Sequence, residues 1–346
     1  MAARVLIVDD SALMRRMMRS FLSADPDLTV VAEAADTVTA RRLIKEHDPD
    51  VVTLDVEMPG MNGIEFLRKI MALRPMPVIM VSTLTARGTD TTLAALEIGA
   101  VDVVHKPGEA LPLAAFGKVL REKVRLAAGI RYGRKAAGAI APAPPAPRWT
   151  PSFIAIGAST GGVSAATDVL RALPATGPPV LLVQHMPEGF TARFAARLDG
   201  QLALDVREAR DGEVLRPGVV RIAPGASHMG VDGHAGALKT TIASGEEVSG
   251  HRPSVDYLFA ALARTGARGL AVVLTGMGRD GADGVAALTD AGAHCIAQDE
   301  ASSVVFGMPR AAIETGKVHH VLPLPEIGPR LCTLSKPNSP HSLRAS

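Results

Sequence analysis

The feature that most constrains this chain is a proline- and alanine-rich stretch in residues 139–147, which reads Ala-Ile-Ala-Pro-Ala-Pro-Pro-Ala-Pro. Proline has no backbone N–H and keeps the preceding residue out of the helical region, so neither a helix nor a central strand fits here. A chain of 346 residues suits about two domains. We therefore expect domains at 1–130 and 152–335, an extended linker at 131–151 and a disordered polar tail at 336–346.

Composition narrows the class of protein. Apolar residues make up 47% of the chain and charged residues 21%, which suits packed soluble domains. The net charge of +2 gives no reason to expect nucleic acid as a partner. Cys295 and Cys332 lack the spacing of a metal or redox pair, which favours a reducing compartment. The first apolar run is too short for a signal peptide, and no run is long enough to cross a membrane. We expect a cytoplasmic protein without direct membrane insertion.

Both predicted domains alternate short, mostly β-branched runs with amphipathic segments. In the first domain, strands are predicted at 4–8, 30–33, 51–54, 78–81 and 101–104, and helices at 13–22, 37–47, 63–73, 89–98 and 113–126. In the second, strands are predicted at 153–156, 180–183, 219–223 and 270–274, and helices at 163–173, 191–198, 254–264 and 281–291. Such alternation indicates two doubly wound α/β domains, the first with a five-stranded parallel sheet and the second with a mostly parallel one.

Polar residues follow four of the predicted strands in the first domain. Asp9 and Asp10 follow the first strand, Asp55 the third, Ser82 the fourth and Lys106 the fifth. Because the carboxyl ends of parallel strands share one edge of a sheet, these side chains are expected to gather there. Crowded carboxylates need a cation, and oxygen ligands suit Mg²⁺. An aspartate beside a metal ion and a lysine can act as a nucleophile toward phosphorus.

A single aspartate at a strand end is more often a turn or a helix cap, but the joint placement is specific. Over residues 3–127 the chain resembles the receiver domain of two-component response regulators, through segments 8–11, 55–63, 81–82 and 106–107. The resemblance implies a flavodoxin-like fold and a histidine kinase of the chemotaxis type as phosphodonor. It implies phosphorylation of Asp55, Mg²⁺ held by Asp9, Asp10, Asp55 and the backbone carbonyl of Glu57, and phosphoryl contacts from Ser82 and Lys106. Val103 stands where receivers usually carry an aromatic switch residue.

The second domain opens with a glycine-rich turn. Residues 157–162, Gly-Ala-Ser-Thr-Gly-Gly, lie between a predicted strand and a helix and fit the G-x-S-x-G nucleophile elbow around Ser159. The same turn also suits a phosphate-binding loop at a helix N-terminus. A nucleophilic serine needs a base and an orienting acid, and His185 and Asp280 each follow a predicted strand. A lone histidine there is more often structural, whereas the three residues together favour a triad.

The order Ser, His, Asp differs from that of the α/β-hydrolases. Over residues 153–325 the second domain resembles the catalytic domain of chemotaxis protein-glutamate methylesterases, through segments 156–162, 184–186, 190–191, 223–225, 251–256, 274–278 and 305–309. The resemblance implies Ser159, His185 and Asp280 as the triad, Met277 beside the site, no cofactor in this domain, and methyl-accepting chemotaxis receptors as substrates. Backbone N–H groups near Thr160 and Gly161 are expected to form the oxyanion hole. His251 and Arg252 receive no role.

Two other classes of function stay open at this point. A DNA-binding response regulator needs a helix-turn-helix and usually a basic face, and neither is apparent in 153–325. A nucleotide-binding loop at 157–162 leaves His185 and Asp280 unexplained and lacks the P-loop lysine. Hydrolysis of a simple ester by the second domain alone would distinguish an esterase from both.

Overall fold

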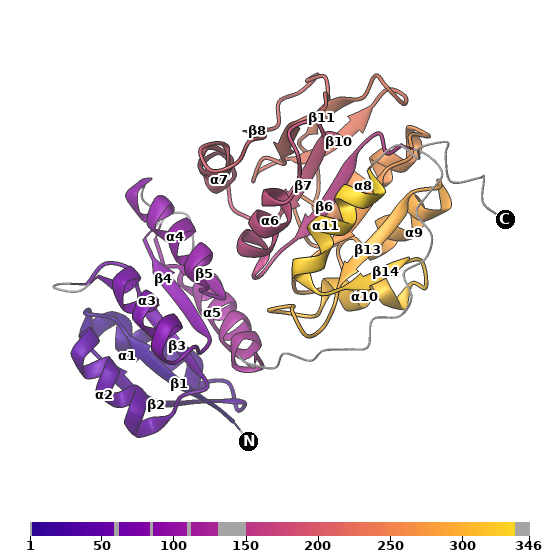
Figure 1. Cartoon of the computed structure of the whole chain (residues 1–346). Helices are drawn as coiled ribbons and strands as arrows, with labels where there is room; N and C mark the ends of the chain where they lie inside the picture. Colours follow the sequence, from indigo (N-terminus) through magenta and orange to yellow (C-terminus); the bar gives the residue numbers. More distant parts are fainter. Residues whose placement is uncertain (1, 59–61, 84–85, 109–111, 131–149, 336–346) are drawn as a thin grey trace. The chain divides into compact units, whose positions relative to one another are not determined.

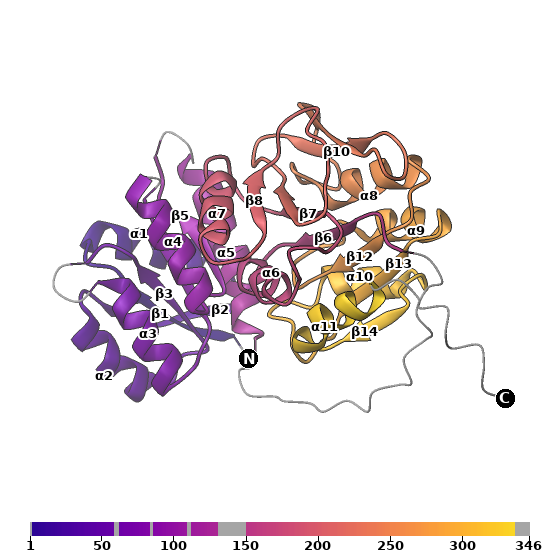
Figure 2. The ribbon, with the colours of Figure 1, turned by 45° about the horizontal axis from the view of Figure 1, so that its top comes forward.

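The computed structural model describes residues 2–58, 62–83, 86–108, 112–130 and 150–335 (Figures 1 and 2). The contacts divide the chain into two compact units, Met1–Arg134 (unit 1) and Lys135–Ser346 (unit 2). Most of the predicted linker and the whole predicted tail lie outside the described residues. No helix within the described residues is long and apolar enough to cross a membrane.

Unit 1 is a five-stranded sheet with helices on both faces, as predicted. Its strands are β1 (Ala3–Val8), β2 (Leu28–Ala34), β3 (Val51–Asp55), β4 (Val78–Ser82) and β5 (Asp102–His105), in the order β2-β1-β3-β4-β5 with every pairing parallel. Its helices are α1 (Ala12–Ser23), α2 (Thr37–His47), α3 (Gly63–Leu73), α4 (Ala86–Ile98) and α5 (Leu113–Ala128). Helix α4 begins three residues before the predicted start at residue 89.

Local signals explain why these helices begin where they do. The side chains of Ser11, Asp36 and Asn62 accept backbone N–H groups at the starts of α1, α2 and α3, as N-caps do. Alternate strand residues such as Leu6, Val8 and Leu54 pack against α2 and α3 in one core. Helices α1 and α5 pack together, with the rings of Phe21 and Phe116 edge to face at 6.0 Å.

Unit 2 is a second parallel sheet with a small antiparallel hairpin. The sheet order is β14-β13-β12-β6-β7-β9-β8, and every pairing in it is parallel. Its strands are β6 (Ile154–Ala158), β7 (Val180–Gln184), β8 (Asp205–Glu208), β9 (Val219–Ile222), β12 (Leu270–Val273), β13 (His294–Gln298) and β14 (His320–Leu322). The hairpin joins β10 (His228–Asp232) to β11 (Lys239–Ala243). The helices are α6 (Gly162–Arg171), α7 (Phe190–Asp199), α8 (Val255–Arg264), α9 (Ala282–Asp290), α10 (Met308–Glu314) and α11 (Leu324–Leu334).

The strand order of unit 2 gives it a topological switch point. From β6 the chain builds β7, β9 and β8 on one side and later adds β12, β13 and β14 on the other. In doubly wound sheets, ligands bind outside the carboxyl ends of the strands at such a point. The residues that follow β6, β7 and β12 therefore occupy the expected place for a site.

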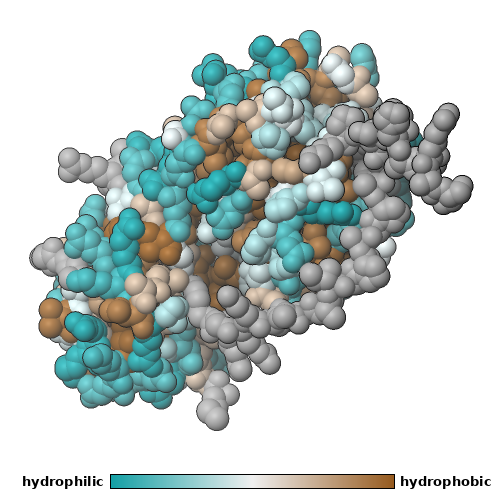
Figure 3. All heavy atoms as spheres, in the orientation of Figure 1, coloured by the Kyte–Doolittle hydropathy of each residue, from teal (hydrophilic) through white to brown (hydrophobic). Residues whose placement is uncertain are grey.

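The surface of each unit is mixed in character. On the face shown in Figure 3, hydrophobic residues lie among hydrophilic ones in both units. The exposed large apolar side chains include Val38 and Leu73 in unit 1 and Met277 in unit 2. Of these, Met277 is the one that the sequence assigned to a site.

Candidate active site and acidic cluster

Ser159, His185 and Asp280 come from three neighbouring strand ends of unit 2. Ala158 pairs with Gln184 across β6 and β7, so Ser159 and His185 occupy the next position on two adjacent strands. The His185 N–H donates to the Ala158 carbonyl at 3.1 Å. Asp280 follows β12, the other neighbour of β6. The register of β6 and β7 brings Ser159 and His185 to one edge of the sheet, and the segment after β12 brings Asp280 into contact with His185.

The turn that carries Ser159 requires its glycines. Gly161 has φ +77°, a left-handed conformation that side chains rarely adopt, and a Cβ there would lie 2.6 Å from Cβ of Val304. A Cβ on Gly162 would lie 2.2 Å from Oε1 of Gln184. The Gly162 N–H closes the turn onto the Ser159 carbonyl at 2.7 Å, and Gln184 Nε2 donates to the same carbonyl at 2.9 Å. Ser159 thus sits in a tight strand-to-helix turn, as a nucleophile elbow requires.

Asp280 is fully buried and accepts four hydrogen bonds. Its Oδ1 accepts the Ser254 hydroxyl at 2.8 Å and the Asp256 N–H at 2.9 Å. Its Oδ2 accepts the Val255 N–H at 2.7 Å and lies 2.8 Å from Nε2 of His185. Burial alone would raise the pKa of Asp280, but the bonds from His185 and from the start of α8 outweigh it, and the pKa is lowered. Asp280 is therefore held as an anion.

The contact with Asp280 also fixes the chemistry of the His185 ring. An ionised carboxylate only accepts hydrogen bonds, so Nε2 carries the proton in the neutral imidazole. The other nitrogen, Nδ1, is buried and has no hydrogen-bond partner among the described residues. Nδ1 is therefore the basic nitrogen of His185, and the sequence did not indicate which of the two it would be.

The residues predicted to surround the oxyanion lie in the Ser159 turn or next to it. Thr160 and Gly161 immediately precede α6, and the Thr160 carbonyl accepts the Thr275 hydroxyl at 3.0 Å. Gly276 passes so close to the turn that a Cβ on it would lie 2.8 Å from Cβ of Ser159. Met277 follows Gly276 and is 39% exposed. The structure places these residues near Ser159, and their roles stay predictions.

Sequence reasoning missed the group that holds Asp280. Ser254 caps α8 through the Tyr257 N–H and also donates to Asp280, while Val255 and Asp256 supply N–H groups from the same helix start. A serine just before an apolar helix is a recognisable N-cap signal. Nothing in its own segment indicates a second partner that lies 26 residues farther along the chain.

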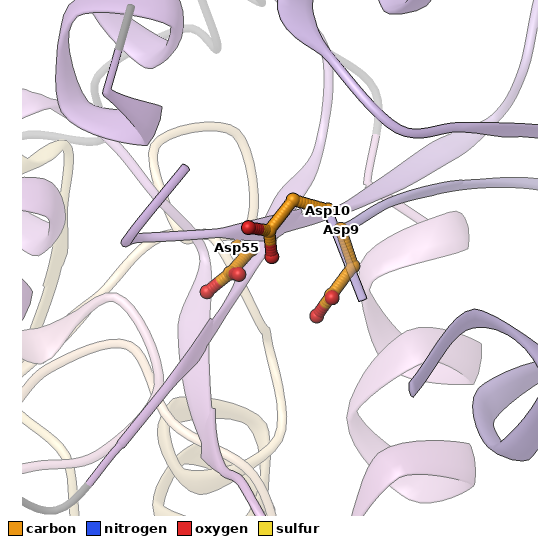
Figure 4. A group of neighbouring side chains, drawn as sticks. All are labelled: Asp9, Asp10 and Asp55. Atoms are coloured by element: carbon orange, nitrogen blue, oxygen red, sulfur yellow. The ribbon is translucent and has the colours of Figure 1, made fainter. Parts of the chain in front are cut away.

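In unit 1 the predicted metal ligands converge. Asp9, Asp10 and Asp55 each offer a carboxylate oxygen, and these oxygens lie within 4.8 Å of one another (Figure 4). Asp9 and Asp55 are buried, and Asp10 is exposed. The Lys106 ammonium lies 2.8 Å from Oδ2 of Asp55 and 3.0 Å from Oδ2 of Asp9. Burial, helped by the charge of Asp9, raises the pKa of Asp55 to about 6, although Lys106 opposes the shift.

This cluster fits a hard divalent cation. The two buried carboxylates, Asp9 and Asp55, have one ammonium between them, and burial together with the charge of Asp9 raises the pKa of Asp55. The Glu57 N–H donates to Oδ1 of Asp55 at 3.3 Å, so the predicted carbonyl ligand belongs to a residue already adjoining the cluster. Ser82 is buried at the end of β4, where its carbonyl accepts the Lys106 N–H. Val103 packs in the core of unit 1.

Comparison with known proteins identifies both units. The CheB methylesterase family model matches residues 154–331, and the response regulator receiver domain model matches residues 5–115. A protein-glutamate methylesterase/protein-glutamine glutaminase 1 of Caulobacter vibrioides is 50% identical over 337 residues, covering 96% of this chain and 98% of that protein. A second protein of that name from Pseudomonas aeruginosa is 49% identical over 338 residues, covering 96% of each chain.

A solved structure agrees with these matches. The crystal structure of the Thermotoga maritima CheB methylesterase catalytic domain is 38% identical, with a TM-score of 0.52, and covers 54% of this chain and 100% of that one. The predicted family and the predicted folds of both units are confirmed. In this chain a response regulator receiver domain precedes the methylesterase domain. The chain therefore belongs to the CheB methylesterase family.

Proposed function

We propose that this protein hydrolyses glutamyl methyl esters on chemoreceptors, deamidates glutamines there, and is controlled by phosphorylation of Asp55, so that it adapts the receptors. The names of the relatives, protein-glutamate methylesterase/protein-glutamine glutaminase, support the reaction class. The observation that carries the catalytic assignment is the 2.8 Å contact between His185 and the buried Asp280, with Ser159 at the adjoining register position.

The first half of the reaction forms an acyl-enzyme. The Ser159 hydroxyl oxygen attacks the γ-carbonyl carbon of the ester while its proton passes to Nδ1 of His185. The carbonyl electron pair moves to oxygen, where backbone N–H groups near Thr160 and Gly161 stabilise it; one such donor typically contributes ~10²–10³ in rate. The bond to the methoxy group then breaks, and the proton on Nδ1 leaves with methanol.

The second half restores the enzyme. Water attacks the acyl carbon and gives a proton to Nδ1, the bond to Ser159 breaks, and the serine oxygen takes that proton back. The product is a glutamic acid side chain, which releases its remaining proton to the solvent and so carries one new negative charge. With a glutamine substrate, ammonia leaves in place of methanol. Asp280 stays ionised throughout and holds Nε2–H of His185 in place.

The acidic cluster of unit 1 suits phosphoryl transfer from a histidine kinase. A carboxylate oxygen of Asp55 attacks phosphorus, the P–N bond of the phosphohistidine breaks, and the departing imidazole takes a proton from the solvent. Mg²⁺, when bound, supplies positive charge against the phosphoryl oxygens. Its ligands would be Asp9, Asp10, Asp55 and the Glu57 carbonyl, and Ser82 and Lys106 would contact the phosphoryl group.

Phosphorylation then regulates the second unit. A phosphoryl group adds about −1.5 to −2 charges at Asp55. We expect the unphosphorylated receiver to restrain hydrolysis, and this added charge to weaken that restraint. Residues 152–335 alone should then hydrolyse receptor esters faster than the unphosphorylated full chain. A slower fragment would instead mean that the receiver activates hydrolysis or recruits the substrate.

The test of the catalytic assignment is Ser159→Ala. Methanol release from methylated receptors should fall by ~10⁴-fold or more, because no other group replaces the attacking oxygen. Ser164→Ala is the matched control, since Ser164 lies on α6 but contributes nothing to the proposed mechanism. Wild-type turnover by the Ser159→Ala protein would reject the triad.

A further inference from the structure

The His185 ring has a second neighbour, to which the mechanism above gives no role. The imidazole of His251 lies flat against the imidazole of His185, with ring centroids 3.8 Å apart and planes inclined by 15°. His251 is half-buried, and its ring stacks on that of His185. The contact between the two residues is therefore made by ring faces.

The segment that carries His251 is fixed in place. Val248 and His251 exchange two backbone hydrogen bonds, of 3.1 and 3.0 Å, around a tight turn. Within that turn, the Ser249 hydroxyl donates to Oδ2 of Asp256 at 2.7 Å. Asp256 in turn donates its N–H to Asp280 at 2.9 Å. The start of α8 thus anchors both the carboxylate that bonds the edge of His185 and the turn that covers its face.

These two contacts constrain the His185 ring in different ways. The bond from Nε2 to Asp280 fixes one corner of the ring, but the ring plane can still swing about the line from Cβ to that corner. A flat neighbour at van der Waals distance opposes the swing, and the direction of Nδ1 depends on it. A displacement of about 1 Å in a reacting group typically lowers rates ~10²-fold.

The charge state of His251 is compatible with this task. Burial, and then the positive charge of protonated His185, lower the pKa of His251. His251 is therefore neutral at neutral pH, and its ring presents an uncharged aromatic face when His185 takes up the serine proton. A cationic neighbour at this distance would oppose that proton transfer.

We propose that His251 is a positioning residue that holds the plane of the His185 ring, so that Nδ1 stays directed at Ser159, and that it acts through its aromatic face rather than through its nitrogens. This inference rests on the proposed function, because it assigns His251 to the proposed triad. Ser249 and Asp256 support it by holding the turn against α8.

The test compares His251→Ala with His251→Phe in the full chain, by methanol release from methylated receptors. Loss of the ring face should lower kcat by about 10- to 100-fold with little change in KM, because the substrate contacts are left in place. Phenylalanine restores a flat ring without nitrogens and should recover turnover to within about threefold of wild type. Ser249→Ala, which releases the turn, should give a smaller loss of kcat.

A second readout reports on the ring itself. In nitrogen-15 spectra of the imidazoles, wild type and His251→Phe should show a single His185 form protonated at Nε2, and His251→Ala should show a broadened or mixed signal. His294→Ala is the matched control for losing a stacked histidine, since His294 stacks on His319 at the opposite ends of the strands.

Two outcomes would overturn the proposal: full kcat in His251→Ala, or a His251→Phe protein as slow as the alanine variant. The second would mean that His251 works through a nitrogen. Failure of the proposed function is distinguishable, because wild-type turnover by Ser159→Ala would remove the triad whatever the His251 series shows.

Discussion

Each unit places a buried aspartate at the carboxyl edge of a parallel sheet, and the two aspartates have opposite electrostatic surroundings. Asp280 accepts four hydrogen bonds, and its pKa is lowered in spite of its burial. Asp55 shares one ammonium with Asp9, and burial raises its pKa to about 6. The same residue type, at the same place in the same kind of fold, is fully satisfied in one unit and short of partners in the other.

The difference corresponds to the two proposed tasks. An aspartate that orients a histidine must keep its charge and its position, and the start of α8 provides both. An aspartate that attacks phosphorus must keep an oxygen available and must tolerate a cation and a phosphoryl group beside it. Exchanging carboxylate for amide at each site therefore tests the comparison directly.

Of the two exchanges, Asp280→Asn is expected to have the larger effect on hydrolysis. The amide has one oxygen where the carboxylate has two, so its NH₂ group would replace an oxygen that now accepts two hydrogen bonds. We expect kcat for methanol release to fall by ~10³–10⁴-fold, as the imidazole loses its orienting anion. Ser254→Ala removes only one of the four donors and should cost about tenfold. An Asp280→Asn protein within tenfold of wild type would mean that His185 is oriented by something else.

Asp55→Asn is expected to abolish phosphorylation and the response of hydrolysis to it. A small phosphodonor with Mg²⁺ should label the wild-type chain, and the product should be stable in acid and labile in base, as an acyl phosphate is. The asparagine variant should take up no label, and its turnover should no longer rise with phosphodonor. EDTA should prevent labelling of the wild type, because the carboxylate cluster needs its cation. Equal labelling of both proteins would place the phosphoryl group elsewhere.

Sequence reasoning reached the strand-end residues of both sites for one physical reason. Parallel strands end at a common edge, so alternation of strands and helices was enough to bring Asp9 near Asp55, and Ser159 near His185. Helices with clear caps were also predictable. The predicted bounds 37–47 and 63–73 equal those of α2 and α3, which Asp36 and Asn62 cap.

What sequence reasoning missed depends on contacts between distant segments. The stacking of His251 on His185 and the bond from Ser254 to Asp280 exist only after α8 packs beside the sheet. Strands β13 and β14 were not predicted, because one begins with a histidine and the other has three residues. The β10–β11 hairpin and β8 lie in a polar, glycine-containing region without clear alternation.

The smallest expected effect is on the stability of unit 2 in acid, and it comes from a comparison of two histidines. His185 has an anion beside it, whereas His294 packs against His319 and His320, with ring centroids at 4.1 and 4.8 Å, and Arg330 lies 3.1 Å from His320. Burial, and then the neighbouring positive charges, lower the pKa of His294 to about 3, and that of His320 to about 4. An unfolded histidine titrates near pH ~6.5. At a pH between ~6.5 and the lower pKa values of His294 and His320 in the folded protein, these histidines bind protons in the unfolded chain but stay neutral in the native state.

Stability of unit 2 should therefore be greatest above pH ~6.5 and should decline as the pH falls toward 4. For His294 alone, the free energy of unfolding should drop by about 1–2 kcal/mol between pH 7 and pH 5. Urea unfolding of the full chain, followed by hydrogen exchange in peptides from β13 and β14, measures that drop. His294→Leu removes one titrating group without adding charge. Between pH 7 and pH 5 the variant should therefore lose about 1–2 kcal/mol less unfolding free energy than the wild type does. If the two proteins lost stability equally, the acid sensitivity of unit 2 would have to come from groups outside this cluster, such as carboxylates that, like Asp280, are stabilised as anions.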